Sequence, residues 1–219
     1  MSNYEFKITI NFLSYWFISS GVENGAYADQ ITLKDRDGFP YVPGKSIKGV
    51  FREAFRTALK SGWFDRFRHD DSMSDEEFYD KLIQLIFGQN GTVDGYSRDE
   101  LHAEGLIHFT NAEIAGKARS KIGKENSFYL FKTVQSTKIN KETGTAENKS
   151  LRTIEVAIPM HLSANVSVTN PFMENTLGIT EKDMSDILAL FDSVSSLITE
   201  MGGKRRRGFG RCLCSMEII

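Results

Sequence analysis

Residues 154–168 carry the pattern that most restricts how this chain of 219 residues can fold. All eight even-numbered positions from Ile154 to Val168 are apolar, and the positions between them are largely polar. Side chains of a β-strand alternate between two faces, so a period of two places the apolar set on one face. The segment is therefore predicted to be a strand with one buried face.

Three other segments show the period of an amphipathic helix, with apolar residues recurring every three or four positions. These predicted helices cover residues 47–59, 75–87 and 181–201. Ser46 or Gly44 is placed to cap the first helix, and Ser74 to cap the second. Gly88 is placed to end the second helix.

The main predicted elements follow one another as strand, helix, strand, strand, helix, strand. The remaining strands are predicted at residues 4–13, 105–114 and 211–219. This order is that of a ferredoxin-like, RNA-recognition-motif-like βαββαβ core, which makes the fold class α+β. We expect one domain over residues 1–219, with large insertions at about 14–44, 60–104 and 115–150. The last insertion is polar and irregular, with a hairpin tip or mobile protrusion expected at 140–144.

The composition, 40% hydrophobic and 26% charged, is typical of a soluble globular protein. No apolar run approaches 18 residues, and no basic stretch precedes the apolar part of the N-terminus, so neither a membrane helix nor a signal peptide is expected. Cys212 and Cys214 are too few for a structural metal site and are read as reduced thiols in a cytoplasmic protein. None of the four histidines has the spacing of a zinc site.

The segment GGKRRRGFGRC, residues 202–212, combines four glycines with five basic residues in a chain of formal net charge -2. It is neither a Walker loop nor a dinucleotide fingerprint, because it follows a predicted helix and does not precede one. Backbone N–H groups free of side chains, with arginines beside them, predict a polyanion site. The alternative is a glycine cap of the preceding helix with a solvated basic face.

The segment PGKSIKG, residues 43–49, opens the first predicted helix with a turn and two lysines. Free N–H groups at a helix N-terminus attract anions, and Lys45 and Lys48 would add positive charge. Arg52 lies one turn further on. The alternative is a capped helix with solvated lysines.

Four collinear segments resemble the CRISPR-associated RAMP (repeat-associated mysterious protein) superfamily. They are the proline-glycine turn with IKG, IFG at 86–88 followed by GLIHFTNAEI, TKINKETGTAENKSLRTIEVAIP at 137–159, and GGKRRRGFGR. The resemblance spans nearly the whole chain and is closest to the repeated backbone subunit of type III effector complexes.

The resemblance implies which residues bind RNA. Guide-RNA contacts are expected at Lys45, Ser46, Lys48 and Arg52, and at Gly202, Gly203, Lys204, Arg205, Arg206, Arg207, Gly208, Gly210 and Arg211. Residues 133–152 correspond to a thumb-like protrusion that inserts between guide and target and displaces a base pair. In it Ile139 is the candidate wedge, and Lys138, Lys141 and Arg152 are candidate phosphate contacts.

The resemblance also implies target-RNA cleavage by a metal-dependent endoribonuclease, with Asp29 as the catalytic residue in the loop after the first strand. Asp29 would hold a divalent cation, Mg²⁺, or orient the attacking 2′-hydroxyl. Asp35 and Asp37 look like turn residues around Gly38. The segment LSYWFISSGVENG departs from the small and histidine-glycine residues usual in cleaving members, so the surroundings of the site are expected to differ.

The implied partners are guide RNA, target RNA, other CRISPR effector subunits and copies of the chain stacked head to tail in a helical filament, in antiviral defence. Three other functions stay open: a non-catalytic guide-binding subunit, a guide-processing endoribonuclease and a generic RNA-recognition-motif protein. The histidine-dependent processing enzymes are a poorer match to this sequence. RNA-recognition-motif proteins rely on a KGFGFVxF-type aromatic strand motif that this sequence lacks.

Overall fold

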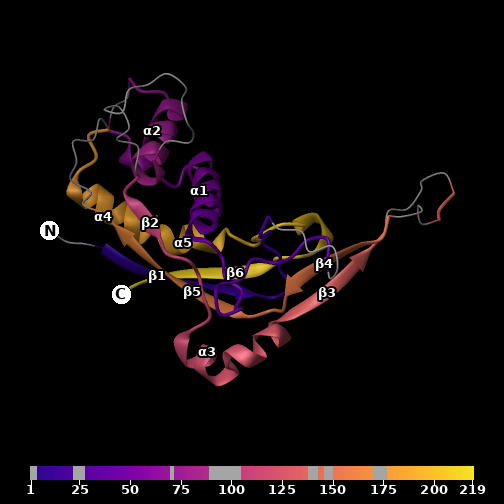
Figure 1. Cartoon of the computed structure of the whole chain (residues 1–219). Coiled ribbons are helices and arrows are strands. Elements are labelled where there is room, and N and C mark those ends of the chain that lie inside the picture. The colour runs from indigo at the N-terminus through magenta and orange to yellow at the C-terminus, as the bar shows by residue number, and fades with distance from the viewer. Residues whose placement is uncertain are drawn as a thin grey trace, which may run out of the picture.

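A four-stranded antiparallel sheet forms the centre of the computed structural model, which describes residues 4–21, 28–69, 72–88, 105–137, 143–145, 150–169 and 177–219. Its strand order is β2-β5-β1-β6. The strands are β1 (Tyr4–Phe12), β2 (Ile107–Phe109), β5 (His161–Val168) and β6 (Cys212–Ile218). The chain is thus an α+β protein with antiparallel sheets (Figure 1).

Strand β1 is central because it pairs with a strand on each side. It pairs with β5 from Tyr4↔Val168 to Asn11↔His161, and with β6 from Phe6↔Ile218 to Phe12↔Cys212. This register places the buried even-numbered residues of all three strands on the same face. Cys212 and Cys214 are among them, as free buried thiols.

Helices α1 (Gly44–Lys60) and α5 (Phe191–Ser196) pack on the strands of this sheet, while α2 (Asp75–Phe87) packs on α1 and α4 (Glu181–Ala189) lies beside α5 (Figure 1). The first two predicted helices are confirmed as α1 and α2, and so are the predicted ends of α2: Ser74 Oγ accepts a bond from the Glu77 N–H at 3.2 Å, and Gly88 follows α2 with a φ of 77°. No helix in the described part of the chain is long and apolar enough to cross a membrane.

The prediction of one strand over residues 154–168 is wrong, because the chain leaves one sheet there and enters another. Strand β4 (Arg152–Ala157) pairs with β3 (Phe131–Ser136) in a separate two-stranded sheet, and β5 begins only at His161. Pro159 lies in the break and has no N–H group for a ladder. The alternation continues across the break because each strand buries its even positions, in two different hydrophobic clusters.

The long helix predicted over 181–201 is also two short helices followed by extended chain. Helix α4 begins in a capping box between Thr180 and Asp183, whose hydrogen bonds lower the pKa of Asp183 to about 2. Helix α5 ends at Ser196. Ile198 and Met201 keep the apolar stripe because the extended segment packs beside β6, where the Cys212 N–H donates to the Thr199 carbonyl at 2.9 Å.

The insertion at 115–150 contains more regular structure than its polar sequence suggested. It includes α3 (Gly116–Ile122), a 3₁₀ segment η3 (Lys124–Leu130) and strand β3. Two further 3₁₀ segments are η1 (Asp65–Phe67) and η4 (Arg205–Arg207). Of the predicted tip, Thr143, Gly144 and the following Thr145 are described, and 140–142 lie outside the described residues. The strand predicted at 105–114 is reduced to β2 and two isolated bridges.

The cap predicted for α1 is also wrong. Neither Ser46 nor Gly44 caps the helix with a side chain; the Asn111 Oδ1, from a distant segment, accepts the Gly44 N–H at 3.0 Å. A Cβ on Gly44 would lie 2.1 Å from the Phe109 carbonyl oxygen. The start of α1 is therefore pressed against the chain that follows β2, and glycine is required by this close approach.

Two glycine substitutions in α1 test this packing. We expect Gly44→Ala to lower the free energy of unfolding by several kcal/mol, because backbone must move to admit the Cβ. Gly49→Ala is the matched control, since a Cβ there meets nothing within 4 Å, and it should raise stability by up to about 1 kcal/mol through helix propensity. Urea unfolding monitored by circular dichroism measures both; equal effects would refute the close contact at Gly44.

Candidate nucleic-acid interface

Residues 202–211, here called the glycine-rich loop, are closed by hydrogen bonds at their base. The Met201 N–H donates to the Gly210 carbonyl at 2.8 Å. The Gly210 N–H donates to the Tyr15 carbonyl, and the Gly203 N–H to the Phe17 carbonyl, both at 2.7 Å. The loop therefore has a defined conformation against the segment that follows β1.

Its glycines serve mainly this contact with the protein's own backbone. A Cβ on Gly210 (φ 76°) would lie 2.0 Å from the Met201 carbonyl oxygen, and one on Gly202 (φ 99°) 2.5 Å from the Phe17 carbonyl oxygen. Gly202 does not cap the preceding helix, which ends five residues before Met201. Gly208 differs, because a Cβ there meets nothing within 4 Å; it is the glycine of these three with open space in front of it.

The basic side chains of the loop have no acidic partner among the described residues. Arg205, Arg206 and Arg207 form η4 and are exposed, and Lys204 before them has a φ of 60° in the left-handed region. Across the described residues, no ion pair includes any of these four side chains or Arg211. A cluster of cations without acidic partners attracts a polyanion.

The glycine-rich loop lies beside the β3–β4 hairpin. Arg207 donates from Nη1 to Ser136 Oγ at 3.3 Å, and Ser136 is the cross-strand partner of Arg152. On the other side, Phe209 packs against Phe17 and the apolar face of β4. Figure 1 shows the hairpin projecting from the body of the molecule. The structure thus brings the loop and Arg152 together, whereas Lys138, Ile139 and Lys141 lie outside the described residues.

Asp29 lies next to Arg152, at the start of β4. Its N–H donates to the Thr153 carbonyl at 2.8 Å, and its Oδ2 accepts the Thr153 N–H at 2.6 Å. The residue is exposed. One carboxylate oxygen therefore holds the Asp29 segment against β4, and the other accepts no hydrogen bond from Thr153.

Asp35 and Asp37 belong to a different part of the molecule, as the turn that the sequence predicted. Asp35 Oδ1 accepts the N–H groups of Asp37 and Phe39, both at 2.9 Å. Arg119 pairs with Asp35 at 2.7 Å and with Asp37 at 3.3 Å. Arg119 neutralises both carboxylates, so neither forms a common site with Asp29.

The N-terminus of α1 has fewer free N–H groups than its sequence suggested. Asn111 accepts from Gly44, and the Pro43 carbonyl accepts from Ser46 and Ile47 at 2.9 and 3.1 Å. Of the first four N–H groups of α1, only that of Lys45 is not among these three hydrogen bonds. The Lys45 side chain is exposed. Lys48 and Arg52 are half-buried, and burial, followed by repulsion from Arg56, lowers the pKa of Arg52.

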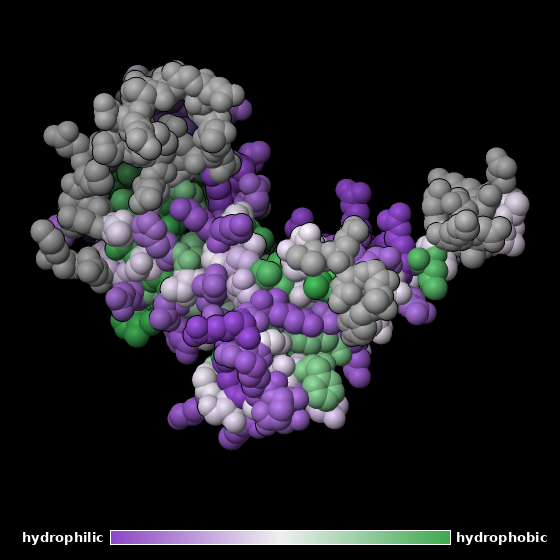
Figure 2. Space-filling model, in the orientation of Figure 1, coloured by the Kyte–Doolittle hydropathy of each residue, from purple (hydrophilic) through white to green (hydrophobic). Residues whose placement is uncertain are grey.

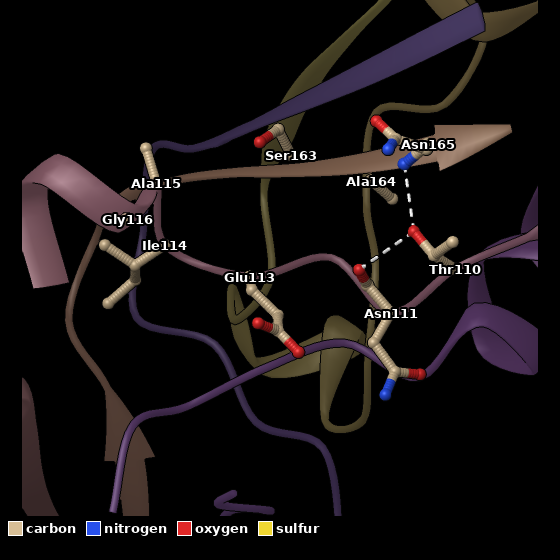
Figure 3. Close-up of a pocket in the computed structure, with 9 residues that line it drawn as sticks. All are labelled: Thr110, Asn111, Glu113, Ile114, Ala115, Gly116, Ser163, Ala164 and Asn165. Atoms are coloured by element: carbon tan, nitrogen blue, oxygen red, sulfur yellow. Dashed lines mark hydrogen bonds between the residues drawn. The ribbon is translucent and has the colours of Figure 1, made fainter. Parts of the chain in front are cut away.

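A polar pocket of about 490 Å³ lies where the chain beyond β2 passes β5, next to this helix start (Figure 3). Thr110 Oγ1 accepts the Asn165 N–H at 2.9 Å and donates to the Asn111 carbonyl at 3.3 Å. Glu113 and Ser163 also line it. None of the residues that the sequence proposed for RNA binding lines the pocket.

The residues described contain no group of three or more His, Cys, Asp or Glu that could hold a metal ion. His69, for instance, pairs through Nε2 with Asp183 at 2.9 Å, far from Asp29 in the sequence. A Mg²⁺ ion at Asp29 fits only if phosphate oxygens and water supply most of its ligands, which is a common way for proteins to bind Mg²⁺.

Sequence reasoning missed the residues that hold the interface in shape. They are Tyr15, Phe17, Asn111, Ser136, Thr153 and Phe209. Most of them act through main-chain atoms or through packing. Other residue types could make the same contacts, so the sequence does not reveal them. Phe209 had a signal, since an aromatic residue between two glycines of a basic loop needs an apolar partner.

Comparison with known proteins gives a family and a fold. The family model of the RAMP superfamily matches residues 9–213. No curated protein matches the chain. The chain is similar to one in a solved structure of the type III-B Cmr-beta bound to cognate target RNA, with a TM-score of 0.58 and 14% identity. The match covers 99% of this chain and 61% of that one, so this chain spans less than two thirds of its length, and the likeness is one of fold.

The two types of glycine in the loop predict different effects of alanine. Gly208→Ala should cost about 1–2 kcal/mol, the usual penalty for a left-handed side chain. Gly210→Ala should cost clearly more, because its Cβ would also collide with the Met201 carbonyl. Thermal unfolding measures the difference, and a Gly208 variant as damaging as the Gly210 variant would contradict the loop closure described above.

Proposed function

This chain belongs to the RAMP superfamily, and on that premise we propose that it is a guide-RNA-binding backbone subunit of a type III CRISPR effector complex. The observation that carries the proposal is the unpaired basic surface of the glycine-rich loop, held beside the β3–β4 hairpin. A fold likeness to a chain of a complex bound to target RNA supports it.

We infer a ferredoxin-like βαββαβ core built from β1, α1, β2, β5, the α4–α5 pair and β6. The strand order β2-β5-β1-β6, antiparallel throughout, supports this assignment. Residues 1–219 form one RAMP domain, and α2, α3 and the β3–β4 hairpin belong to its insertions. The hairpin is then the thumb.

The guide binds through its sugar-phosphate backbone. Lys204 to Arg207, Arg211 and Lys45 supply positive charge, and Gly208 leaves the main chain open to a phosphate. Because the loop is already held by main-chain hydrogen bonds, little ordering entropy opposes binding. Arg152 lies at the junction of loop and thumb, where guide and target would meet.

Cleavage of the paired target is the finer part of the proposal. The ribose 2′-hydroxyl loses its proton to solvent as its oxygen attacks the adjacent phosphorus, the bond to the 5′-oxygen breaks, and that oxygen takes up a proton, so that a cyclic phosphate and a 5′-hydroxyl result. Asp29 orients the 2′-hydroxyl with the carboxylate oxygen that Thr153 does not use. In the alternative role, the same oxygen would hold a bound Mg²⁺, which would supply charge stabilisation for the phosphate.

A non-catalytic guide-binding subunit is the second candidate. The Asp29–Thr153 hydrogen bond favours it, because that bond alone gives Asp29 a structural reason to be present. In both cases copies stack head to tail along the guide, beside other effector subunits.

Guide binding should depend on the loop arginines and on salt. Replacing Arg205, Arg206 and Arg207 with Ala should weaken binding of guide RNA and reduce the slope of log K against log salt by about 2, at roughly 0.7 per lost phosphate contact. The control removes three exposed cations elsewhere, Lys60, Arg66 and Lys182. Fluorescence anisotropy at salt concentrations from about 50 to about 200 mM gives the slope for each variant. Equal slopes for the loop variant and the control variant would contradict guide binding by the loop arginines.

Asp29→Asn separates the two candidates, because asparagine can still accept the Thr153 N–H while losing the charge. We expect target cleavage by the assembled complex in Mg²⁺ to fall by about 100-fold or more, with guide binding unchanged. Asp29→Ala should add a loss of stability. Regularly spaced products at the wild-type rate from the Asn variant would leave Asp29 as a purely structural residue.

A further inference from the structure

Two adjacent aromatic side chains in η3 are exposed to solvent. Phe128 is 61% and Tyr129 67% exposed, and their ring centroids are 3.9 Å apart with an angle of 35° between the planes. Most other phenylalanines described in the structure are buried. An aromatic pair left in water gives up the stabilisation that burial would bring, so its exposure calls for an explanation in terms of a partner.

The pair is carried by a segment that is firmly held. Arg119 in α3 pairs with Asp35 at 2.7 Å and with Glu113 at 3.3 Å, and its guanidinium lies 4.4 Å from the centre of the Phe39 ring. Asn126 Nδ2 donates to the Ile122 carbonyl at 2.7 Å, which joins η3 to the end of α3. The aromatic pair therefore sits on a fixed platform, and a ligand would not have to order it.

The platform is strongly basic. Residues 116–132 contain five cations and one acid, Glu125. Arg119 and Lys124 are used by carboxylates, but Lys117, Lys121 and Lys132 are exposed and take part in no ion pair with any described residue. In Figure 2 the lobe below the sheet, where α3 lies, is mainly hydrophilic, with a hydrophobic group at its border.

We propose that this surface, Phe128 and Tyr129 with Lys117, Lys121 and Lys132, is a second RNA contact that binds an unpaired strand. An unstacked base packs on the aromatic pair, and the lysines neutralise the neighbouring phosphates. Bases in a duplex are already stacked, so the surface selects single-stranded RNA. None of these five residues is among those assigned to guide or target binding above, and the contact requires neither Asp29 nor the glycine-rich loop.

Charge decides between RNA and a protein partner. A protein interface is expected to bury a continuous apolar core depleted of lysine. Here the aromatic pair is preceded by Lys124, Glu125, Asn126 and Ser127, and unpaired lysines lie before and after it in the chain. An isolated aromatic pair among cations matches the combination that single-strand binding proteins use.

The first test is binding of a fluorescein-labelled oligouridine, which has no stable pairing, to the full chain. We expect Phe128→Ala with Tyr129→Ala to raise Kd by about 5- to 150-fold, the range for loss of one base–aromatic stack. Phe128→Trp with Tyr129→Trp should keep binding near the wild-type value, since the rings are retained. Trp63→Ala, another exposed aromatic at 38%, is the control. Wild-type affinity in the double alanine variant would overturn the proposal.

The second test separates this contact from the proposed guide site. RNA containing 4-thiouridine is crosslinked to the wild-type chain, and the peptides are identified by mass spectrometry. Crosslinks at 128–129 support the inference, with or without crosslinks at 204–211. Crosslinks at 204–211 alone leave the guide site standing and overturn the second contact, and crosslinks at neither overturn both. Loss of self-association in the double alanine variant without RNA, measured by sedimentation, would identify the surface as a protein interface and also overturn it.

Discussion

Residues 13–17, the continuation of β1 beyond the sheet, join the glycine-rich loop to strand β4. Leu13, Tyr15 and Phe17 exchange main-chain hydrogen bonds with the glycine-rich loop, at 2.7–2.8 Å. Trp16, between them, exchanges two with Ala157 of β4, at 3.0 and 2.8 Å. One short extended segment thus binds the loop on one side and the β3–β4 hairpin on the other, so their relative position is set by backbone geometry.

This arrangement explains why the loop is rich in glycine without being loose. Gly202 and Gly210 permit backbone contacts too close for a Cβ, and those contacts fix where η4 starts and ends. The arginines of η4 then project from a fixed base, without acidic partners among the described residues. Fixed cations lose less entropy on binding a phosphate chain than cations on a mobile loop.

Prediction succeeded where the signal was local. Helix α2 has its own cap at Ser74, its own apolar stripe and its own glycine at Gly88, and the bounds follow from these residues alone. Prediction failed where a single apolar pattern ran through two different secondary-structure elements. The alternation from 154 to 168 reports that even positions are buried, but not that β4 and β5 bury them in different clusters. For the same reason the stripe over 181–201 concealed the change from helix to extended chain after Ser196.

The sequence by itself determined the α+β class, the first two helices, and the basic, glycine-rich composition of residues 202–211, because period, charge and composition are properties of neighbouring residues. Only the tertiary structure decided that Arg207 meets Ser136 of the hairpin, that Asp29 binds Thr153, and that Asn111 caps α1. It also decided that Phe128 and Tyr129 face water while nearby Phe131 is buried. These are contacts between segments far apart in the chain, or consequences of them, and their energies depend on register and packing that no local pattern specifies.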